Sequence, residues 1–126
     1  EMCIRDRLWT LAAPSPGGNL RAAIAFYPGC GDALRRAPAW SAPVPLLMLL
    51  GAADDWTPAF RCEALVARAP ARVELRLFAG AHHNFDHPSA PQRTRLLPNG
   101  QTVTLGTDPA ARAGSISSVL AFLAAR

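Results

Sequence analysis

Three short apolar runs, each followed by turn-forming residues, constrain the fold of this chain most. They span 22–27, 44–50 and 73–78. Each run is too short for a typical helix and apolar enough to be buried, so each is predicted to be a strand. Segments with helical signals follow the second and third runs, and a helical turn is expected around 32–36. This alternation predicts a parallel sheet with right-handed crossovers.

Two segments carry signals for a helix, one after the second apolar run and one near the end of the chain. Pro58 suits a first helical residue, and the segment that follows has apolar residues at helical spacing, namely Cys62, Leu65, Val66 and Ala69. Asp108 is predicted to cap a last helix, whose apolar stripe is Ile116, Val119, Leu120 and Leu123. The polar connection 87–107 is expected to hold a hairpin, because Asn99-Gly100 is a strong turn dipeptide.

Size and composition exclude several classes of protein. The 126 residues suffice for one domain or part of one, and half of them are hydrophobic. No apolar stretch approaches the roughly 20 residues of a membrane span. The net charge of +4 comes from scattered arginines without any lysine. We therefore expect a globular protein with neither a nucleic acid nor a membrane as partner; the sequence does not indicate the oligomeric state.

The first residues differ in character from the rest. Residues 1–7 resemble a translated sequencing adapter and lack the apolar core of a signal peptide. We expect them to be non-native, which leaves 8–126 as the domain. Cys30 and Cys62 remain outside that segment. They are either free and buried or paired with each other; a disulfide would indicate an exported protein. The compartment, cytoplasmic or exported, stays open.

Titratable residues follow the second and third apolar runs directly. Asp54 and Asp55 come after the run 44–50, and His82 and His83 come after the run 73–78. The carboxyl ends of parallel strands lie at one edge of a sheet, where such folds bind ligands. An acid and a base placed there are typical of a hydrolytic triad. No G-x-S-x-G or G-x-C-x-G occurs in the chain, so a nucleophile is expected upstream of this fragment.

Three segments together resemble the dienelactone hydrolase family of α/β-hydrolases: Arg21–Cys30, Gly51–Pro58 and Gly80–Phe85. The family places its acid in a G-x-x-D-x-x-[VT]-P turn and its base in a G-A-x-H-x-F turn. The resemblance spans 8–126 and assigns Asp54 as the acid and His83 as the base. It implies that the chain is the C-terminal part of an α/β-hydrolase fold, with about three parallel strands and flanking helices.

The same resemblance implies a function. The parent protein would hydrolyse a small-molecule ester or lactone through a nucleophile–His–Asp triad, with neither a metal nor an organic cofactor. The nucleophile, a Ser or a Cys, would lie shortly before residue 8, so this fragment alone is expected to be inactive. The connection 86–107 resembles an insertion of some exported or uncharacterised members. It argues against the muconate-pathway dienelactone as the substrate.

Several alternatives stand beside these assignments. Asp55 competes with Asp54 and His82 with His83, and Cys30 could be a nucleophile, although it lacks the elbow glycine two residues earlier. A metal site would use the cluster of His82, His83, Asp86 and His87. Adjacent histidines usually diverge, which disfavours that site. An apolar acyl pocket would use Trp40, Trp56 and Phe85. The rival function is a non-catalytic α/β-hydrolase-like binding module.

Overall fold

A parallel three-stranded sheet forms the centre of the molecule. The computed structural model describes residues 20–36 and 39–126, so the expectation about residues 1–7 lies outside the described part. The strands β1 (Ala23–Phe26), β2 (Leu46–Gly51) and β3 (Val73–Phe78) pair in the order β1–β2–β3. All three strands predicted from the apolar runs are confirmed, and the third has the expected bounds.

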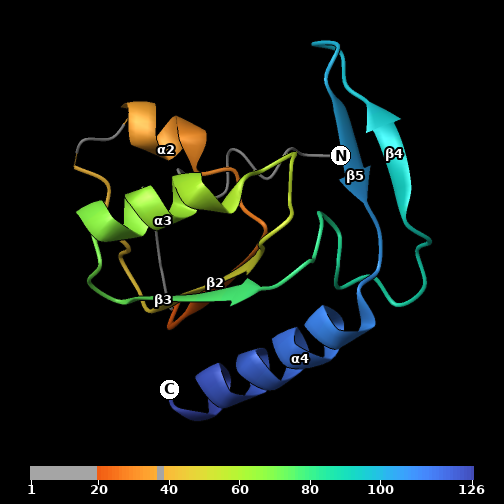
Figure 1. The fold of residues 1–126 in the computed structure, drawn as a ribbon. Helices are drawn as coiled ribbons and strands as arrows, with labels where there is room; N and C mark the ends of the chain where they lie inside the picture. The colour runs from red at the N-terminus through yellow and green to blue at the C-terminus, as the bar shows by residue number, and fades with distance from the viewer. Residues whose placement is uncertain (1–19, 37–38) are drawn as a thin grey trace.

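Helices cover both faces of this sheet (Figure 1). The helices α2 (Gly31–Arg36) and α3 (Ala59–Arg68) lie on one face, and α4 (Pro109–Ala124) lies on the other. Every residue of β2 is buried. Successive side chains of a strand point to opposite faces. Accordingly, Leu46, Met48 and Leu50 join the core beneath α2 and α3, whereas Leu47 and Leu49 join the core beneath α4. The chain therefore has the predicted α/β architecture.

Helix α3 buries the side that the sequence predicts. Cys62 and Leu65 are buried, and Val66 and Ala69 pack against the same core. Pro58 stands at the N-cap, one residue earlier than expected, with an extended ψ of 136°. Cys62 forms a disulfide with Cys30, which precedes α2. The disulfide therefore fastens α2 to α3 across the helical layer.

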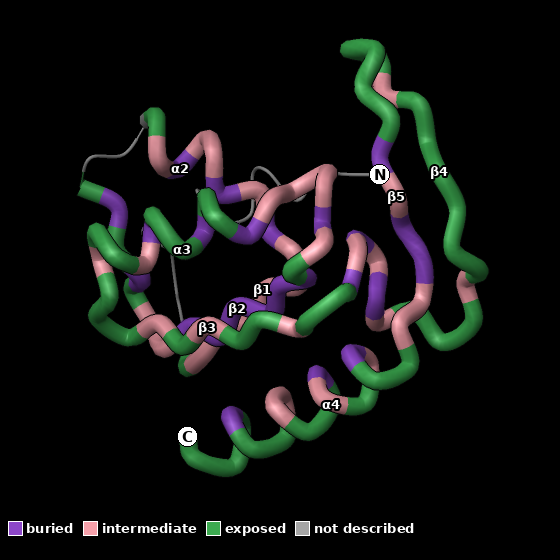
Figure 2. Tube along the Cα trace, in the orientation of Figure 1, coloured by how far each residue is buried: buried purple, intermediate pink, exposed green. Residues whose placement is uncertain are grey.

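Helix α4 begins as predicted but buries a different face. The Asp108 side chain accepts a hydrogen bond of 3.0 Å from the Ala111 amide and so caps the helix. The buried residues are Ala111, Ser115 and Phe122. In contrast, Ile116, Leu120 and Leu123 of the expected stripe are 45%, 64% and 48% exposed. Figure 2 shows this pattern of burial along the helix.

The reason lies in the small residues that α4 turns towards the sheet. A Cβ atom on Gly114 would lie 2.8 Å from the Phe78 ring, so the helix approaches β3 too closely for a larger residue there. At so close a contact, alanine, serine and glycine fit between the helix and the sheet, whereas branched side chains do not. Ile116, Leu120 and Leu123 consequently lie outside this contact, whereas Val119 of the expected stripe packs against the core beneath α4.

A two-stranded antiparallel hairpin precedes α4. It comprises β4 (Arg93–Leu96) and β5 (Thr102–Leu105). Its turn contains Asn99 and Gly100, and Gly100 has a φ of +86°, which glycine adopts readily. The predicted hairpin is thus confirmed, and it stands apart from the three-stranded sheet (Figure 1). In the part of the chain that the structure describes, no helix has the length and apolar character needed to cross a membrane.

Candidate active site

Two turns meet at the carboxyl edge of the sheet. We call residues Gly51–Pro58 the acid turn and residues Gly80–Phe85 the base turn. The Ala53 amide donates a hydrogen bond of 2.9 Å to the Ala81 carbonyl and so joins the two turns. A Cβ atom on Gly51 would lie only 2.4 Å from the same carbonyl oxygen. Glycine is therefore required at the end of β2, because any side chain would push the turns apart.

Asp54 and His83 contact each other directly between these turns. Asp54 Oδ2 lies 2.9 Å from His83 Nδ1, and their side chains are 1% and 10% exposed. An ionised carboxylate can only accept hydrogen bonds, so this contact requires the proton on Nδ1. In the neutral imidazole, Nε2 then carries the lone pair and can take up a proton. The structure thus brings together the two residues that the sequence singles out as acid and base.

The carboxylate of Asp54 is held by its own turn. Its Oδ1 accepts hydrogen bonds from the backbone amides of Trp56 and Thr57, both at 2.9 Å. This leaves Oδ2 for the imidazole. A buried charge is stabilised when hydrogen-bond donors surround it, and here two come from rigid backbone. The local fold of the acid turn consequently fixes the direction in which Asp54 faces His83.

Thr57 contributes a hydroxyl to which the sequence assigned no role. Thr57 Oγ1 lies 3.0 Å from Asp54 Oδ2, 3.1 Å from His83 Nδ1 and 3.0 Å from the Tyr27 carbonyl oxygen. A hydroxyl has one proton to donate and two lone pairs. It can donate to one of the two oxygens while it accepts from the Nδ1 proton. Thr57 therefore links the acid, the base and the end of β1.

Two aromatic side chains contact the imidazole of His83. The ring centroids of Tyr27 and Trp56 lie 4.3 Å and 4.7 Å from that of His83. Tyr27 directly follows β1 and has a φ of +39°, an uncommon conformation for a residue with a side chain. Sequence reasoning missed Tyr27, although it is the last residue of a predicted strand and lies at the same sheet edge as Asp54. Trp56 was considered for an acyl pocket, and the structure places it beside the base.

The phenol of Tyr27 is tied to the segment after the base turn. Its hydroxyl donates a hydrogen bond of 2.9 Å to Asp86 Oδ1. Burial raises the pKa of Tyr27 far above its ordinary value, and the negative charge of Asp86 and this hydrogen bond raise it further. The phenol therefore stays protonated and donates throughout the physiological pH range. Tyr27 orients its ring against His83 in this way.

The rivals considered from the sequence lie elsewhere. Asp55 Oδ1 accepts a hydrogen bond of 2.9 Å from the Thr104 amide in the hairpin. Among the described residues, neither aspartate makes a hydrogen bond with His82, whose buried Nδ1 has no hydrogen-bond partner. Cys30 is in the disulfide and so offers no free thiol.

The remaining two aromatic residues belong to the core and not to a pocket at the site. Trp40 is buried in the cluster beneath α2 and α3. Phe85 is fully buried in the cluster beneath α4, where its ring contacts Phe26 and Phe78. Of the three aromatic residues expected to shape an acyl pocket, only Trp56 contacts the candidate base.

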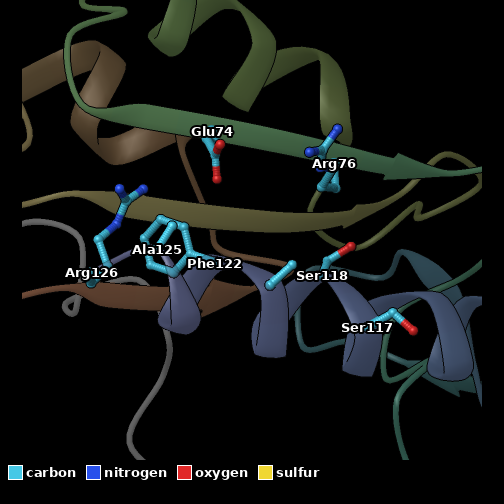
Figure 3. A pocket seen from close by; sticks show the side chains of 8 residues that line it. Glu74, Arg76, Ser117, Ser118, Phe122, Ala125 and Arg126 are labelled. Carbon is cyan, nitrogen blue, oxygen red and sulfur yellow. The ribbon is translucent and has the colours of Figure 1, made fainter.

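In the described part of the chain, neither a cluster of metal-ligating side chains nor the pocket between β3 and α4 coincides with this site. Within residues 20–36 and 39–126, no group of three or more His, Cys, Asp or Glu side chains converges as metal ligands would. A pocket between β3 and α4 contains neither Asp54 nor His83 (Figure 3). Its lining residues are Glu74, Arg76, Ser117, Ser118, Ala121, Phe122, Ala125 and Arg126. The candidate acid–base pair therefore lies at the carboxyl edge, apart from this pocket.

Comparison with models of known protein families gives a match to this chain. A model of the dienelactone hydrolase family matches residues 2–126. The matched range contains both turns, the hairpin and α4, and it also takes in most of the N-terminal segment set aside above. No similar protein was found among curated proteins, and no similar chain among solved structures.

Proposed function

Since the chain belongs to the dienelactone hydrolase family of α/β-hydrolases, we propose that Asp54 and His83 are the acid and the base of a nucleophile–His–Asp triad. The triad would hydrolyse a small-molecule ester or lactone, and its nucleophile would come from the chain upstream of this fragment. The observation that carries the proposal is the 2.9 Å contact between Asp54 Oδ2 and His83 Nδ1 at the carboxyl edge of the sheet.

The chemistry follows from the protonation state that this contact imposes. His83 Nε2 takes the proton of the nucleophile, a Ser or a Cys of the same protein, and the oxygen or sulfur of this nucleophile attacks the acyl carbon of the substrate. The protonated imidazole then gives its proton to the leaving alkoxide, and an acyl-enzyme remains. Water deacylates the enzyme by the same route: Nε2 takes a proton from the water and returns it to the nucleophile as the acid product leaves.

Asp54 has a separate task in this sequence. It keeps the proton of the neutral imidazole on Nδ1, and its charge stabilises the imidazolium that forms when Nε2 is protonated. The buried position of the Asp54 side chain, 1% exposed, strengthens this electrostatic effect. No step of the proposed reaction needs a metal or an organic cofactor.

The test compares this fragment with the same chain extended by its upstream coding sequence. We expect the fragment not to hydrolyse p-nitrophenyl acetate or a simple lactone faster than its His83→Ala variant. We expect the extended protein to hydrolyse one of them. There, His83→Ala and Asp54→Asn should each lower kcat by roughly 10⁴-fold, as in other triads.

Two matched variants serve as controls. His82→Ala removes the neighbouring histidine, and Asp32→Asn changes an aspartate on α2; both should retain activity. Hydrolysis by the fragment that disappears with His83→Ala would contradict the proposal. So would an upstream reading frame without a Ser or Cys elbow, which would favour a binding module instead.

A further inference from the structure

The hairpin β4–β5 is attached to the acid turn at Asp55. Asp55 Oδ1 accepts a hydrogen bond of 2.9 Å from the Thr104 amide, and the Asp55 carbonyl accepts one of 3.0 Å from Gln101 Nε2. The two partners lie 49 and 46 residues further along the chain. An isolated two-stranded hairpin is marginally stable at best in water. Its position therefore depends on contacts of this kind with the rest of the molecule.

The base turn provides the other attachment. His83 forms a parallel β-bridge with Leu105, and the Gly106 amide donates a hydrogen bond of 3.0 Å to the His83 carbonyl. The end of the hairpin is consequently joined to the backbone of the candidate base. Asp55 secures the hairpin nearer to its turn, on the acid side of the same site.

One face of the hairpin is directed towards the candidate site. Arg95 is paired with Val103 across the hairpin, and paired residues of antiparallel strands share a face. Val103 is fully buried, so this face points inwards. The guanidinium carbon of Arg95 lies 5.3 Å from the centre of the Trp56 ring. The Trp56 ring in turn contacts His83, so the hairpin borders the site.

We propose that Asp55 is a positioning residue that fastens the hairpin to the acid turn and thereby holds the hairpin as a fixed wall of the site beside Trp56 and His83. The attachment itself stands on the contacts above. That the wall borders an acyl site rests on the proposed function. Asp54 and Asp55 thus have different tasks although they are neighbours: Asp54 contacts the imidazole, and Asp55 contacts the hairpin.

The test measures hydrogen exchange of the hairpin in the chain as it is, without any substrate. Asp55→Ala removes a hydrogen bond that the Thr104 amide donates to the Asp55 carboxylate, so amides of residues 93–105 should exchange about tenfold faster or more. Asp55→Asn retains an oxygen that can accept from Thr104, and exchange should return to within about threefold of the unmodified chain. Asp32→Ala, which removes a carboxylate from α2, is the matched control and should leave the hairpin unchanged.

A second readout separates positioning from general loss of structure. The indole N–H signal of Trp56 and the ring signals of His83 should shift in Asp55→Ala but not in Asp32→Ala. Exchange of β2 amides should stay unchanged in both variants. Equal hairpin exchange in Asp55→Ala and the unmodified chain would overturn the proposal, as would an equal acceleration of β2. Because no catalysis is measured, failure of this proposal is distinguishable from failure of the proposed function.

Discussion

Replacing Thr57 with valine removes one hydroxyl from the candidate site and retains the shape of the side chain. The lost oxygen lies 3.0 Å from Asp54 Oδ2, 3.0 Å from the Tyr27 carbonyl and 3.1 Å from His83 Nδ1. Because a hydroxyl carries one proton, it donates to one of the two oxygens at any time and accepts from the imidazole. The substitution therefore removes one donated and one accepted hydrogen bond.

The expected loss in the free energy of unfolding follows from these two lost hydrogen bonds. A net hydrogen bond is worth about 1 kcal/mol, and a buried polar group left without its partner costs about 1–3 kcal/mol. Asp54 Oδ2 keeps its hydrogen bond with the imidazole in the variant. Most of the lost stability therefore comes from the Tyr27 carbonyl, which loses the Thr57 hydroxyl as a donor. We expect the free energy of unfolding to fall by about 1–2 kcal/mol. With a urea m-value of about 1–3 kcal/mol/M, the midpoint of unfolding should fall by roughly 0.3–2 M.

The matched control is Thr104→Val in β5. Thr104 contacts Asp55 through its backbone amide, which valine also has, so this substitution should change the stability by less than about 0.5 kcal/mol. Both variants are measured by urea unfolding followed by circular dichroism. If Thr57→Val unfolds at the same urea concentration as the unmodified chain, or if the two variants lose equal stability, the assignment of a linking role to Thr57 is wrong.

Three further predictions concern the supports of the site. Gly51→Ala should lower the free energy of unfolding by at least about 2 kcal/mol, because the new methyl group would meet backbone of the base turn at 2.4 Å; an unchanged thermal midpoint would contradict this. Reducing the Cys30–Cys62 disulfide, which joins residues 32 positions apart, should cost about 3–4 kcal/mol in urea unfolding, and the double serine variant should then no longer respond to reductant. Tyr27 is the single tyrosine of the chain, so the rise in absorbance at 295 nm with increasing pH reports its ionisation alone. Because burial and Asp86 raise its pKa, Tyr27 should ionise well above about pH 10 in the folded chain. Above about pH 10 only the unfolded chain then ionises, so the stability should fall as the pH rises past that value. Ordinary titration near pH 10 in the folded chain would refute the buried contact.

The sequence predicted the sheet well because its signals are local. Each apolar run has a proline or glycine within two residues of its carboxyl end, and the strands formed within one or two residues of the bounds of the runs. The position of Asp54 near His83 also followed from one general rule, that parallel strands deliver their ends to one edge.

Other features depend on packing that no local pattern encodes. Leu120 of α4 is a stronger apolar signal than Ser115, yet Leu120 is exposed and Ser115 is buried; no local pattern encodes the close approach of α4 to Phe78 at Gly114. Thr57 and Tyr27 meet across 30 positions of the chain, and only the folded sheet edge brings them together. Asp55 could not be separated from Asp54 in sequence because the difference lies in which side of the turn each carboxylate faces.

The most direct test of the central claim is the tautomer of His83, read from the ¹⁵N chemical shifts of its ring at a pH where the imidazole is neutral. The account predicts a proton on Nδ1 and none on Nε2 in the unmodified chain. In Asp54→Asn the preference should weaken or reverse, while Asp32→Asn should leave it unchanged. A neutral ring protonated on Nε2 in the unmodified chain, or the same tautomer in all three proteins, would contradict the claim that Asp54 sets His83 up as a base.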